Sequence, residues 1–355
     1  MDRGKKPCNS VESRNNKIYM DLKDVIRVNA LPFLPAKSLC RCTSVCRDWK
    51  LQISSPFFAH TQSNAFHDIS GFFCQNKSSQ FPSFISLDPA AYGLPDPSLT
   101  FLPEPVDIRC SSNGLLCCQG CTESKAYYIC NPVTRKWKKL PKPNADHGST
   151  PALVLVFEPS VLSFVAEYML ICAFPSELDG YEFEIYSSAE GSWRISPEII
   201  FGNRELVPTS GVHVGGIIYW LSRCSGIVAF DLKNERTRLL YGYALGALGE
   251  VNGKLYSASL HGSKLTVVEL CNSFTNTMQM HSKQKSWNMK VEINLMGPLL
   301  DPGSNVVFVG GNLVLIRSGK RIVSVDMKTQ TTTTLTAELD YSSRVVHYVN
   351  SLVEI

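Results

Sequence analysis

Apolar residues recur three and four positions apart in two short stretches near the N-terminus. The first stretch predicts an amphipathic helix over residues 21–30, with its apolar positions at Leu22, Val25, Ile26 and Val28. Pro32 follows closely, and a proline inside a helix removes a backbone hydrogen bond, so this helix should end at or before residue 31.

The second stretch predicts a single longer helix that begins at Ala36. Its apolar positions, at helical spacing, are Leu39, Cys42, Val45, Cys46 and Trp49. Pro35 suits the start of this helix because its missing N–H does no harm there, and Pro56 is expected to mark the end of the helical region. Helices this short cannot bury enough apolar surface alone, so their apolar faces are expected to be covered either by a partner or by the domain that follows, on which they would pack as an N-terminal cap.

From about residue 65 the helical rhythm gives way to short β-rich segments separated by Gly, Pro, Asn and Asp, which is typical of all-β structure. A strand–turn–strand unit recurs, with its turns at Asn131, Ser187, Asp231, around residue 272, and Asp326. The spacing of about 40 to 56 residues is that of a four-stranded propeller blade, such as a kelch unit.

A second hairpin is expected before each of these units, with Asn or Gly at its turn, as at Asn113-Gly114, Gly215-Gly216 and Asn252-Gly253. One further composite blade is predicted to close the ring. Its four expected strands are 69–73, 84–87, 99–101 and 345–349. The predicted fold is therefore α+β and multidomain, a small all-α module followed by an all-β, kelch-like propeller of six blades.

Charge changes this picture little. Residues 1–50 hold eleven Lys or Arg against five Asp or Glu, a net of +6, so the remaining residues carry −2 of the overall +4. Residues 1–17 are interpreted as a disordered basic tail, and no nucleic-acid binding is predicted. No apolar run approaches a membrane span and no secretory signal is recognised, so we expect a protein of the cytoplasm or nucleus without membrane contact.

Candidate chemistry is sparse. The thirteen cysteines are expected to be reduced, and neither the group at 40, 42 and 46 nor that at 117, 118 and 121 has zinc-ligand spacing. The seven histidines form no metal motif, no nucleophile motif is present, and Glu182 and Glu184 are expected to face solvent on one side of a strand. No catalytic residue, metal or cofactor is predicted.

Aromatic and loop positions offer the remaining binding candidates. Trp137, Trp193 and Trp220 recur at repeat positions and are expected to fill the spaces between blades. Target recognition is expected in irregular loops, whose ligand the sequence does not specify. The candidate loops are 144–150, 175–180, 203–210 and 272–286.

Two motifs identify a family resemblance. Residues 34–39, Leu-Pro-Ala-Lys-Ser-Leu, match the pattern L-P-x-K-S-L, and residues 45–49, Val-Cys-Arg-Asp-Trp, match V-C-[KR]-x-W. This run resembles an F-box, and the whole layout resembles the plant F-box proteins with an F-box-associated or kelch-like propeller. The resemblance implies an F-box over 18–61 and the propeller over 62–355. Asn29 and Pro32 depart from the family pattern.

The resemblance also implies a function. The chain would be a non-catalytic substrate receptor of a Skp/cullin/F-box ubiquitin ligase, in which the F-box binds a Skp-type adaptor held by a cullin with its RING subunit, and the propeller binds an unknown target protein. The implied adaptor-binding positions are Leu22, Val25, Ile26, Leu34, Pro35, Leu39, Val45, Cys46 and Trp49. The alternative is an interaction protein that carries an F-box but acts outside a cullin ligase.

Overall fold

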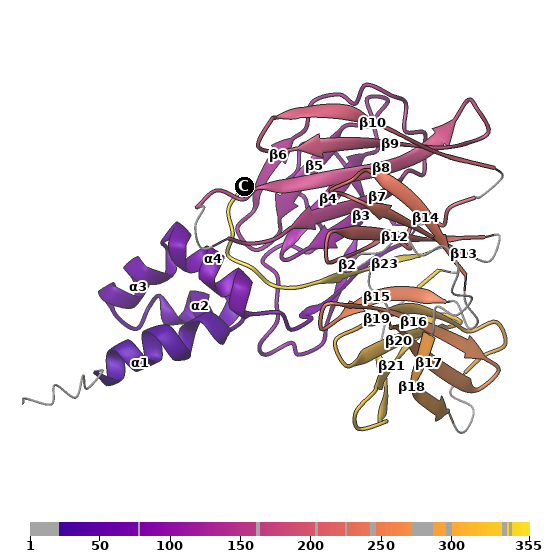
Figure 1. Ribbon diagram of the computed structural model, residues 1–355. Helices are drawn as coiled ribbons and strands as arrows, with labels where there is room; N and C mark the ends of the chain where they lie inside the picture. The colour runs from indigo at the N-terminus through magenta and orange to yellow at the C-terminus, as the bar shows by residue number, and fades with distance from the viewer. Residues whose placement is uncertain are drawn as a thin grey trace, which may run out of the picture.

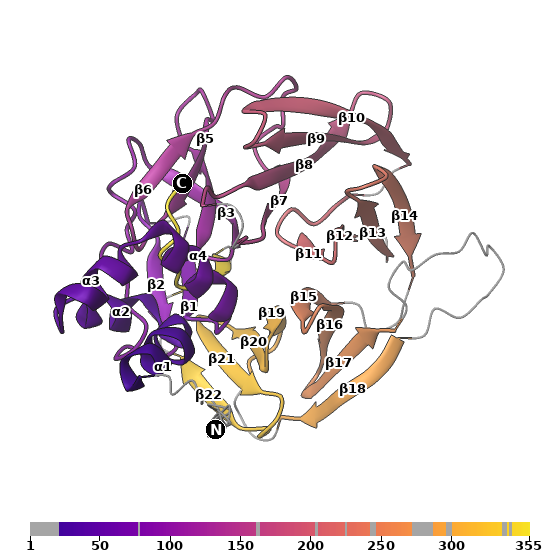
Figure 2. The same ribbon diagram turned by 60° about the vertical axis from the view of Figure 1, so that its left-hand side comes forward.

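The computed structural model describes residues 21–76, 79–160, 164–202, 205–223, 226–241, 246–271, 287–295, 300–335, 339–340 and 343–355. Helices occupy residues 22–65, which we call the helical region, and the strands that follow form a ring of sheets (Figure 1 and Figure 2). Within the described residues no helix is long and apolar enough to cross a membrane.

The helical region contains four α-helices and one short 3-10 helix. These are α1 (Leu22–Asn29), η1 (Leu31–Phe33), α2 (Ala36–Cys42), α3 (Arg47–Ile53) and α4 (Pro56–Ala65). The first helix ends at Asn29, as its nearby proline predicts, and Pro32 lies inside the 3-10 turn that follows.

The single helix predicted from Ala36 to Trp49 is wrong, because the chain breaks between α2 and α3. The Thr43 and Ser44 hydroxyls turn back and donate to the carbonyls of Cys40 and Arg41, at 2.6 and 2.7 Å. Cys46 is extended and caps α3, its sulfur accepting from the Trp49 amide at 3.5 Å. The apolar residues keep a spacing of three or four positions across this break. Such spacing alone therefore cannot distinguish one long helix from two consecutive short helices.

The prediction that Pro56 ends the helical region is also wrong, since Pro56 is the first residue of α4. The Ser55 hydroxyl accepts from the Phe58 amide at 3.2 Å, so the Ser-Pro pair forms an N-terminal cap. The last helix then continues to Ala65, four residues past the expected boundary at 61.

Six sheets follow, which we number as blades 1 to 6. Blade 1 contains β1 (Gly71–Gln75), β2 (Ser83–Ser86) and β23 (Arg344–Tyr348); blade 2 contains β3 (Val106–Ser112), β4 (Leu115–Gly120), β5 (Tyr127–Asn131) and β6 (Lys136–Lys139); blade 3 contains β7 (Ala152–Phe157), β8 (Tyr168–Ser176), β9 (Gly180–Ser187) and β10 (Ser192–Phe201).

The second half of the chain repeats this arrangement. Blade 4 contains β11 (Val212–Val214), β12 (Ile217–Ser222), β13 (Gly226–Asp231) and β14 (Arg236–Leu240); blade 5 contains β15 (Ala247–Val251), β16 (Lys254–His261), β17 (Lys264–Leu270) and β18 (Trp287–Asn294); blade 6 contains β19 (Asn305–Gly310), β20 (Leu313–Ser318), β21 (Arg321–Asp326) and β22 (Thr332–Leu335). All pairings are antiparallel.

The sheets close into a six-bladed propeller, as predicted (Figure 2). The innermost strands β3, β7, β11, β15, β19 and β23 contact one another in sequence around the ring. Closure depends on β23, which pairs with β1 in register from Gly71↔Tyr348 to Gln75↔Arg344. The composite blade therefore joins the end of the propeller to its beginning and leaves the ring without an open seam.

One strand of the composite blade was predicted wrongly. Blade 1 has three strands among the described residues, and residues 99–101 form a turn instead of a fourth strand. Leu99 has a φ of 58°, which a strand does not allow, and its buried side chain packs with Phe73 and Tyr348. The apolar run thus reflects core packing without strand pairing.

The predicted repeat turns at Asn131, Ser187, Asp231 and Asp326 lie between the third and fourth strands of their blades, while the one around residue 272 falls outside the described residues. Four of them close in the same way, with the amide of the fifth residue donating to the carbonyl of the first: Arg135 to Asn131, Gly191 to Ser187, Glu235 to Asp231, and Gln330 to Asp326. The fifth residue has a positive φ in each, between 50° and 68°. Polar first residues suit this turn because their side chains accept from the following amides.

Candidate functional site

The helical region has a small core of its own. Leu31, Leu39, Ile53 and Phe58 are buried together, and Leu352 from the C-terminal segment packs against them. Side chains from four helical elements and from the end of the propeller therefore share one apolar cluster. This core fixes how the exposed surfaces of the helices are presented.

The nine predicted adaptor-binding residues fall into three groups in this arrangement. Exposed are Leu22, Val25, Val45 and Cys46; half-buried are Ile26, Leu34 and Trp49; buried are Pro35 and Leu39. The Leu39 side chain has no exposed area, so it can support a binding surface but cannot touch a partner in this arrangement. These nine residues therefore divide by exposure into candidates for direct contact and residues that pack within the helical region.

Sequence reasoning missed part of the exposed surface. Val28, Phe33, Leu51 and Phe57 are each more than half exposed, at 60, 58, 63 and 54%. Together with Leu22, Val25 and Val45 they form what we call the exposed apolar set. These are seven of the sixteen large apolar side chains found exposed among the described residues, although the helical region is far shorter than the propeller.

The sequence contained a signal for two of these four residues. Val28 belonged to the apolar pattern of the first predicted helix, and Leu51 follows the Trp49 motif position by two residues. Phe33 lies beside a proline in the short 3-10 helix and Phe57 beside one in the first turn of α4, where helical spacing gives no guide to exposure. Such positions require the arrangement of the helices to be known.

Gln62 on α4 connects the helical region to the propeller. Its amide nitrogen donates to the carbonyls of Leu34 and Asn350, at 3.4 and 3.3 Å, and its amide oxygen accepts from the Leu352 amide at 3.3 Å. The side chain is completely buried. One amide group thus links α4, Leu34 on the segment before α2, and the segment that follows β23.

The C-terminal segment is itself held by blade 2. Asn131 donates from Nδ2 to the carbonyls of Ser351 and Val353, at 2.9 and 2.7 Å, and Val353 is buried in the core between blades 2 and 3. The Ser63 hydroxyl also donates to the Asn113 carbonyl at 3.4 Å. These contacts hold the exposed apolar set in a defined position relative to the propeller.

Comparison with known proteins decides the family. The family described as "F-box protein At3g26010-like, beta-propeller" matches residues 98–350, most of the chain. This chain is a plant F-box protein of that family. F-box protein At5g07610 of Arabidopsis thaliana is 28% identical, over 80% of this chain and 72% of its own, and F-box protein At5g49610 of the same plant is 27% identical, over 84% and 87%. Among solved structures, YCF48 from Cyanidioschyzon merolae aligns at 10% identity and a TM-score of 0.41, covering 76% of this chain and 86% of its own.

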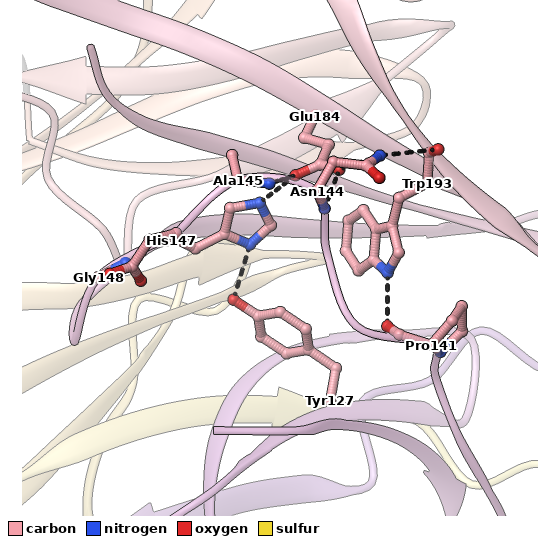
Figure 3. A network of polar contacts seen from close by, with 9 residues as sticks. Tyr127, Pro141, Asn144, Ala145, His147, Gly148, Glu184 and Trp193 are labelled. Atoms are coloured by element: carbon pink, nitrogen blue, oxygen red, sulfur yellow. Dashed lines mark hydrogen bonds and ion pairs between the residues drawn. The ribbon is translucent and has the colours of Figure 1, made fainter. Parts of the chain in front are cut away.

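The F-box protein also contains a buried polar network in blade 3 (Figure 3). Glu184 was expected to face solvent, but it is completely buried. Its carboxylate accepts from the Asn144 amide and side chain at 2.8 and 2.9 Å, from the Ala145 amide at 3.2 Å, and bonds His147 Nε2 at 2.8 Å. The segment before β7 folds over the strand, which alternation along β9 alone cannot reveal.

His147 lies between this carboxylate and Tyr127, whose hydroxyl is 3.0 Å from Nδ1. Burial lowers the pKa of His147, against the opposing effect of Glu184, which favours a neutral ring that donates to Glu184 and accepts from Tyr127. A Tyr-His-Glu chain could relay a proton if substrate reached it. All three side chains are at least 95% buried in this F-box protein, so the network acts on stability, not on an external substrate.

The network also restricts one candidate recognition loop of the F-box protein. Asn144, Ala145 and His147 are tied to Glu184, so this part of the loop 144–150 holds the blade together. The loop 175–180 forms an exposed hairpin turn, residues 203–204 of the third loop are outside the described residues, and so is the whole of the fourth, 272–286.

The three tryptophans of this F-box protein differ. Trp220 and Trp193 are buried between blades at 0 and 7% exposure, as expected, and Phe183 of blade 3 stacks on Phe230 of blade 4 at 4.6 Å beside Trp220. Trp137 was expected to be buried too, but it is 42% exposed on β6. Its indole packs edge-on against the buried ring of Tyr128 on β5, with the ring centres 5.9 Å apart.

Proposed function

We propose that this chain is the substrate-recognition subunit of a Skp/cullin/F-box ubiquitin ligase. The helical region would bind a Skp-type adaptor, which links it to a cullin and its RING subunit, and the propeller would bind the target protein. The receptor would catalyse no reaction itself, and its place of action would be the cytoplasm or nucleus. It would act by holding a target lysine near ubiquitin carried by another subunit, which raises the effective concentration of the two.

The observation that supports this function is the exposed apolar set on an F-box-like sequence. Helix α1 buries none of its residues completely, and among its apolar side chains only Ile26 packs into the helical core. Apolar side chains left exposed in such number on short helices are typical of a surface that a partner covers. The family's F-box assignment makes a Skp-type adaptor the natural partner.

The burial of the nine candidate adaptor-binding residues supports different proposed roles for them. We propose that Leu22, Val25, Val45 and Cys46 contact the adaptor directly, together with the half-buried Ile26, Leu34 and Trp49. Pro35 and Leu39 would act by holding α2 in place, because they are buried. Phe33 and Leu51 join the proposed contact residues because they are exposed nearby in the sequence.

The test is recovery of adaptor and cullin with the full-length chain. Leu22→Asp/Val45→Asp places charges on side chains that are 70 and 63% exposed, so the variant should fold, and it should lose both partners. The matched control is Leu178→Asp, an equally exposed leucine at 63% in a blade 3 turn, which should retain both. Loss of about 2 kcal/mol or more of adaptor binding is expected if these residues are hot spots.

Three outcomes separate the alternatives. Recovery of adaptor without cullin in the unmodified chain would support an interaction protein that acts outside a cullin ligase. Recovery of neither partner would contradict the receptor proposal. Equal recovery by the double variant and by the unmodified chain would show that the exposed apolar set is not the adaptor site.

A further inference from the structure

Strand β6 carries an unusual concentration of exposed positive charge. Arg135, Lys136, Lys138, Lys139 and Lys142 lie on this strand or beside it and are all exposed. With the half-exposed Trp137 we call this group the basic strip. No aspartate or glutamate occurs between Arg135 and Lys142.

On the outer strands of blades 3, 4 and 5, cations form ion pairs with nearby carboxylates. Arg194 on β10 pairs with Glu235, Arg236 on β14 with Glu198, and Lys290 on β18 with Glu269, at 2.5, 3.2 and 2.9 Å. In the part of the chain that the structure describes, none of the five cations of the basic strip has an acidic oxygen within 4.0 Å. Their charges are therefore available to a partner.

One acidic group lies near the end of the strip. The Lys139 ammonium group is 6.0 Å from the centre of the Tyr128 ring, and the Tyr128 hydroxyl donates to Glu104 at 2.5 Å. Lys139 therefore sits beside a carboxylate that is already hydrogen-bonded. Arg135, Lys136, Lys138 and Lys142 carry the remaining, uncompensated charge.

The strand has the geometry to receive an extended chain. In register with β5, Lys136 and Lys138 oppose Asn131 and Ile129 on one face, while Trp137 lies with Lys139 on the other. Among the described residues β6 pairs with β5 alone, so its outer edge has unused backbone donors and acceptors. An added strand could bond to this edge and place alternate side chains beside the lysines.

Edge lysines by themselves can serve to prevent unwanted strand pairing between molecules. Trp137 does not fit that explanation, because a large exposed aromatic ring promotes association instead of preventing it. A tryptophan between lysines suits a partner that brings both carboxylates and apolar groups.

We infer that the basic strip is a docking surface for an extended, acidic segment of a partner protein. Charge complementarity supports a short acidic segment in preference to a nucleic acid. Outside residues 1–50 the chain has 24 Lys or Arg against 26 Asp or Glu, so a long polyanion extending beyond the strip would meet a surface of net negative charge. The inference concerns binding by the propeller and does not depend on the adaptor proposal.

The experiment measures binding of the full-length chain to a short fluorescent peptide in which glutamate alternates with valine. Lys136→Glu/Lys138→Glu should raise the dissociation constant about tenfold or more, because charge repulsion replaces attraction on one face of the strand. Lys136→Gln/Lys138→Gln removes the charges without reversal and should give a smaller increase. Trp137→Ala should weaken binding more than Trp137→Phe.

The matched control is Lys233→Glu/Lys328→Glu, which makes the same charge change at exposed lysines in turns of blades 4 and 6. It should change the dissociation constant by no more than about twofold, as expected for distant screened charges. The inference is overturned if both charge-reversed variants weaken binding equally, or if a peptide with glutamine in place of glutamate binds as well. Failure of the unmodified chain to bind, or tighter binding of an oligothymidylate, would overturn it too.

Discussion

Removal of the Glu184 carboxylate should strongly destabilise blade 3. Glu184→Ala leaves the Asn144 and Ala145 amides and His147 buried without their acceptor. The expected loss in the free energy of unfolding is about 3 kcal/mol or more, the cost of breaking a buried charged network. Urea denaturation of the full-length chain measures it.

Glu182→Ala is the control for this prediction. It lies two residues earlier on the same strand, is only half-buried, and accepts from one hydroxyl, that of Ser176. Its loss should be about 1 kcal/mol or less. If the two variants were equally stable, Glu184 would not organise the network.

The two glutamates also show how far the burial of a single side chain can be predicted from sequence. Alternation correctly placed both on one face of β9, but it could not show that the segment before β7 covers Glu184. Leu39 presents the converse case, since its motif position was recognised while its orientation, into the helical core, was not. A sequence motif shows which residue type is required at a position but not which neighbours its side chain contacts.

At the scale of elements, the repeat turns allow the effect of glycine on stability to be predicted by comparing the same turn position in two blades. Gln330 adopts a φ of 56° at the position that glycine occupies in blade 3, where Gly191 has a φ of 68°. Gln330→Gly should therefore raise the free energy of unfolding by about 0.5 to 1 kcal/mol, because the left-handed conformation strains residues with a Cβ atom.

Gly191→Ala should lower the free energy of unfolding by a similar amount. Thermal denaturation of the two variants and the unmodified chain can compare the changes. No atom lies within 4 Å of a Cβ built on Gly191, so crowding would not confuse the result. Destabilisation by Gln330→Gly would show that chain entropy outweighs backbone strain at this turn.

Most elements could be predicted because blades repeat. Polar turn residues at regular spacing mark the third and fourth strands, and Asn-Gly or Gly-Gly pairs mark the first and second, since only certain residues tolerate those backbone angles. The errors in the predicted elements occurred where there is no repeat. Ser44 and Cys46 interrupt a helical rhythm through local hydrogen bonds, and Leu99 is apolar because it enters a core between blades.

At the scale of the whole molecule, acid should weaken the fold before the carboxylates are protonated. Burial lowers the pKa of His60, His147, His213 and His347 below the usual 6.5, that of His347 to about 4. The unfolded chain then binds more protons than the folded one. Stability that is present above about pH 6.5 is therefore lost as the pH falls toward 5.

Urea denaturation at about pH 7 and about pH 5 tests this, over a window in which ordinary carboxylates remain ionised. His347→Gln should reduce the loss in the free energy of unfolding between these two pH values. Replacement of the exposed His67 by glutamine should leave that loss unchanged. An equal loss in the unmodified chain and in His347→Gln would exclude His347 as a source of the acid sensitivity.

The link between helices and propeller gives a further prediction at this scale. Gln62→Ala removes three hydrogen bonds that join α4, Leu34 and the C-terminal segment, at an expected cost of about 1 to 3 kcal/mol. Amide hydrogen exchange should accelerate in α1 to α4 more than in blades 3 to 5. The neighbouring exposed Asn64→Ala should leave exchange unchanged, and uniform acceleration throughout the chain would contradict a local link.

The composite blade has a consequence for synthesis on the ribosome. Domains fold from the N-terminal side as the chain emerges, yet β1 has no inner partner until residues 344–348 have been made, and Gln62 lacks its C-terminal partners until Asn350 and Leu352 have been made. A nascent chain would therefore carry an open ring and loosely attached helices. The finished arrangement of the exposed apolar set would appear only on molecules whose propeller has closed.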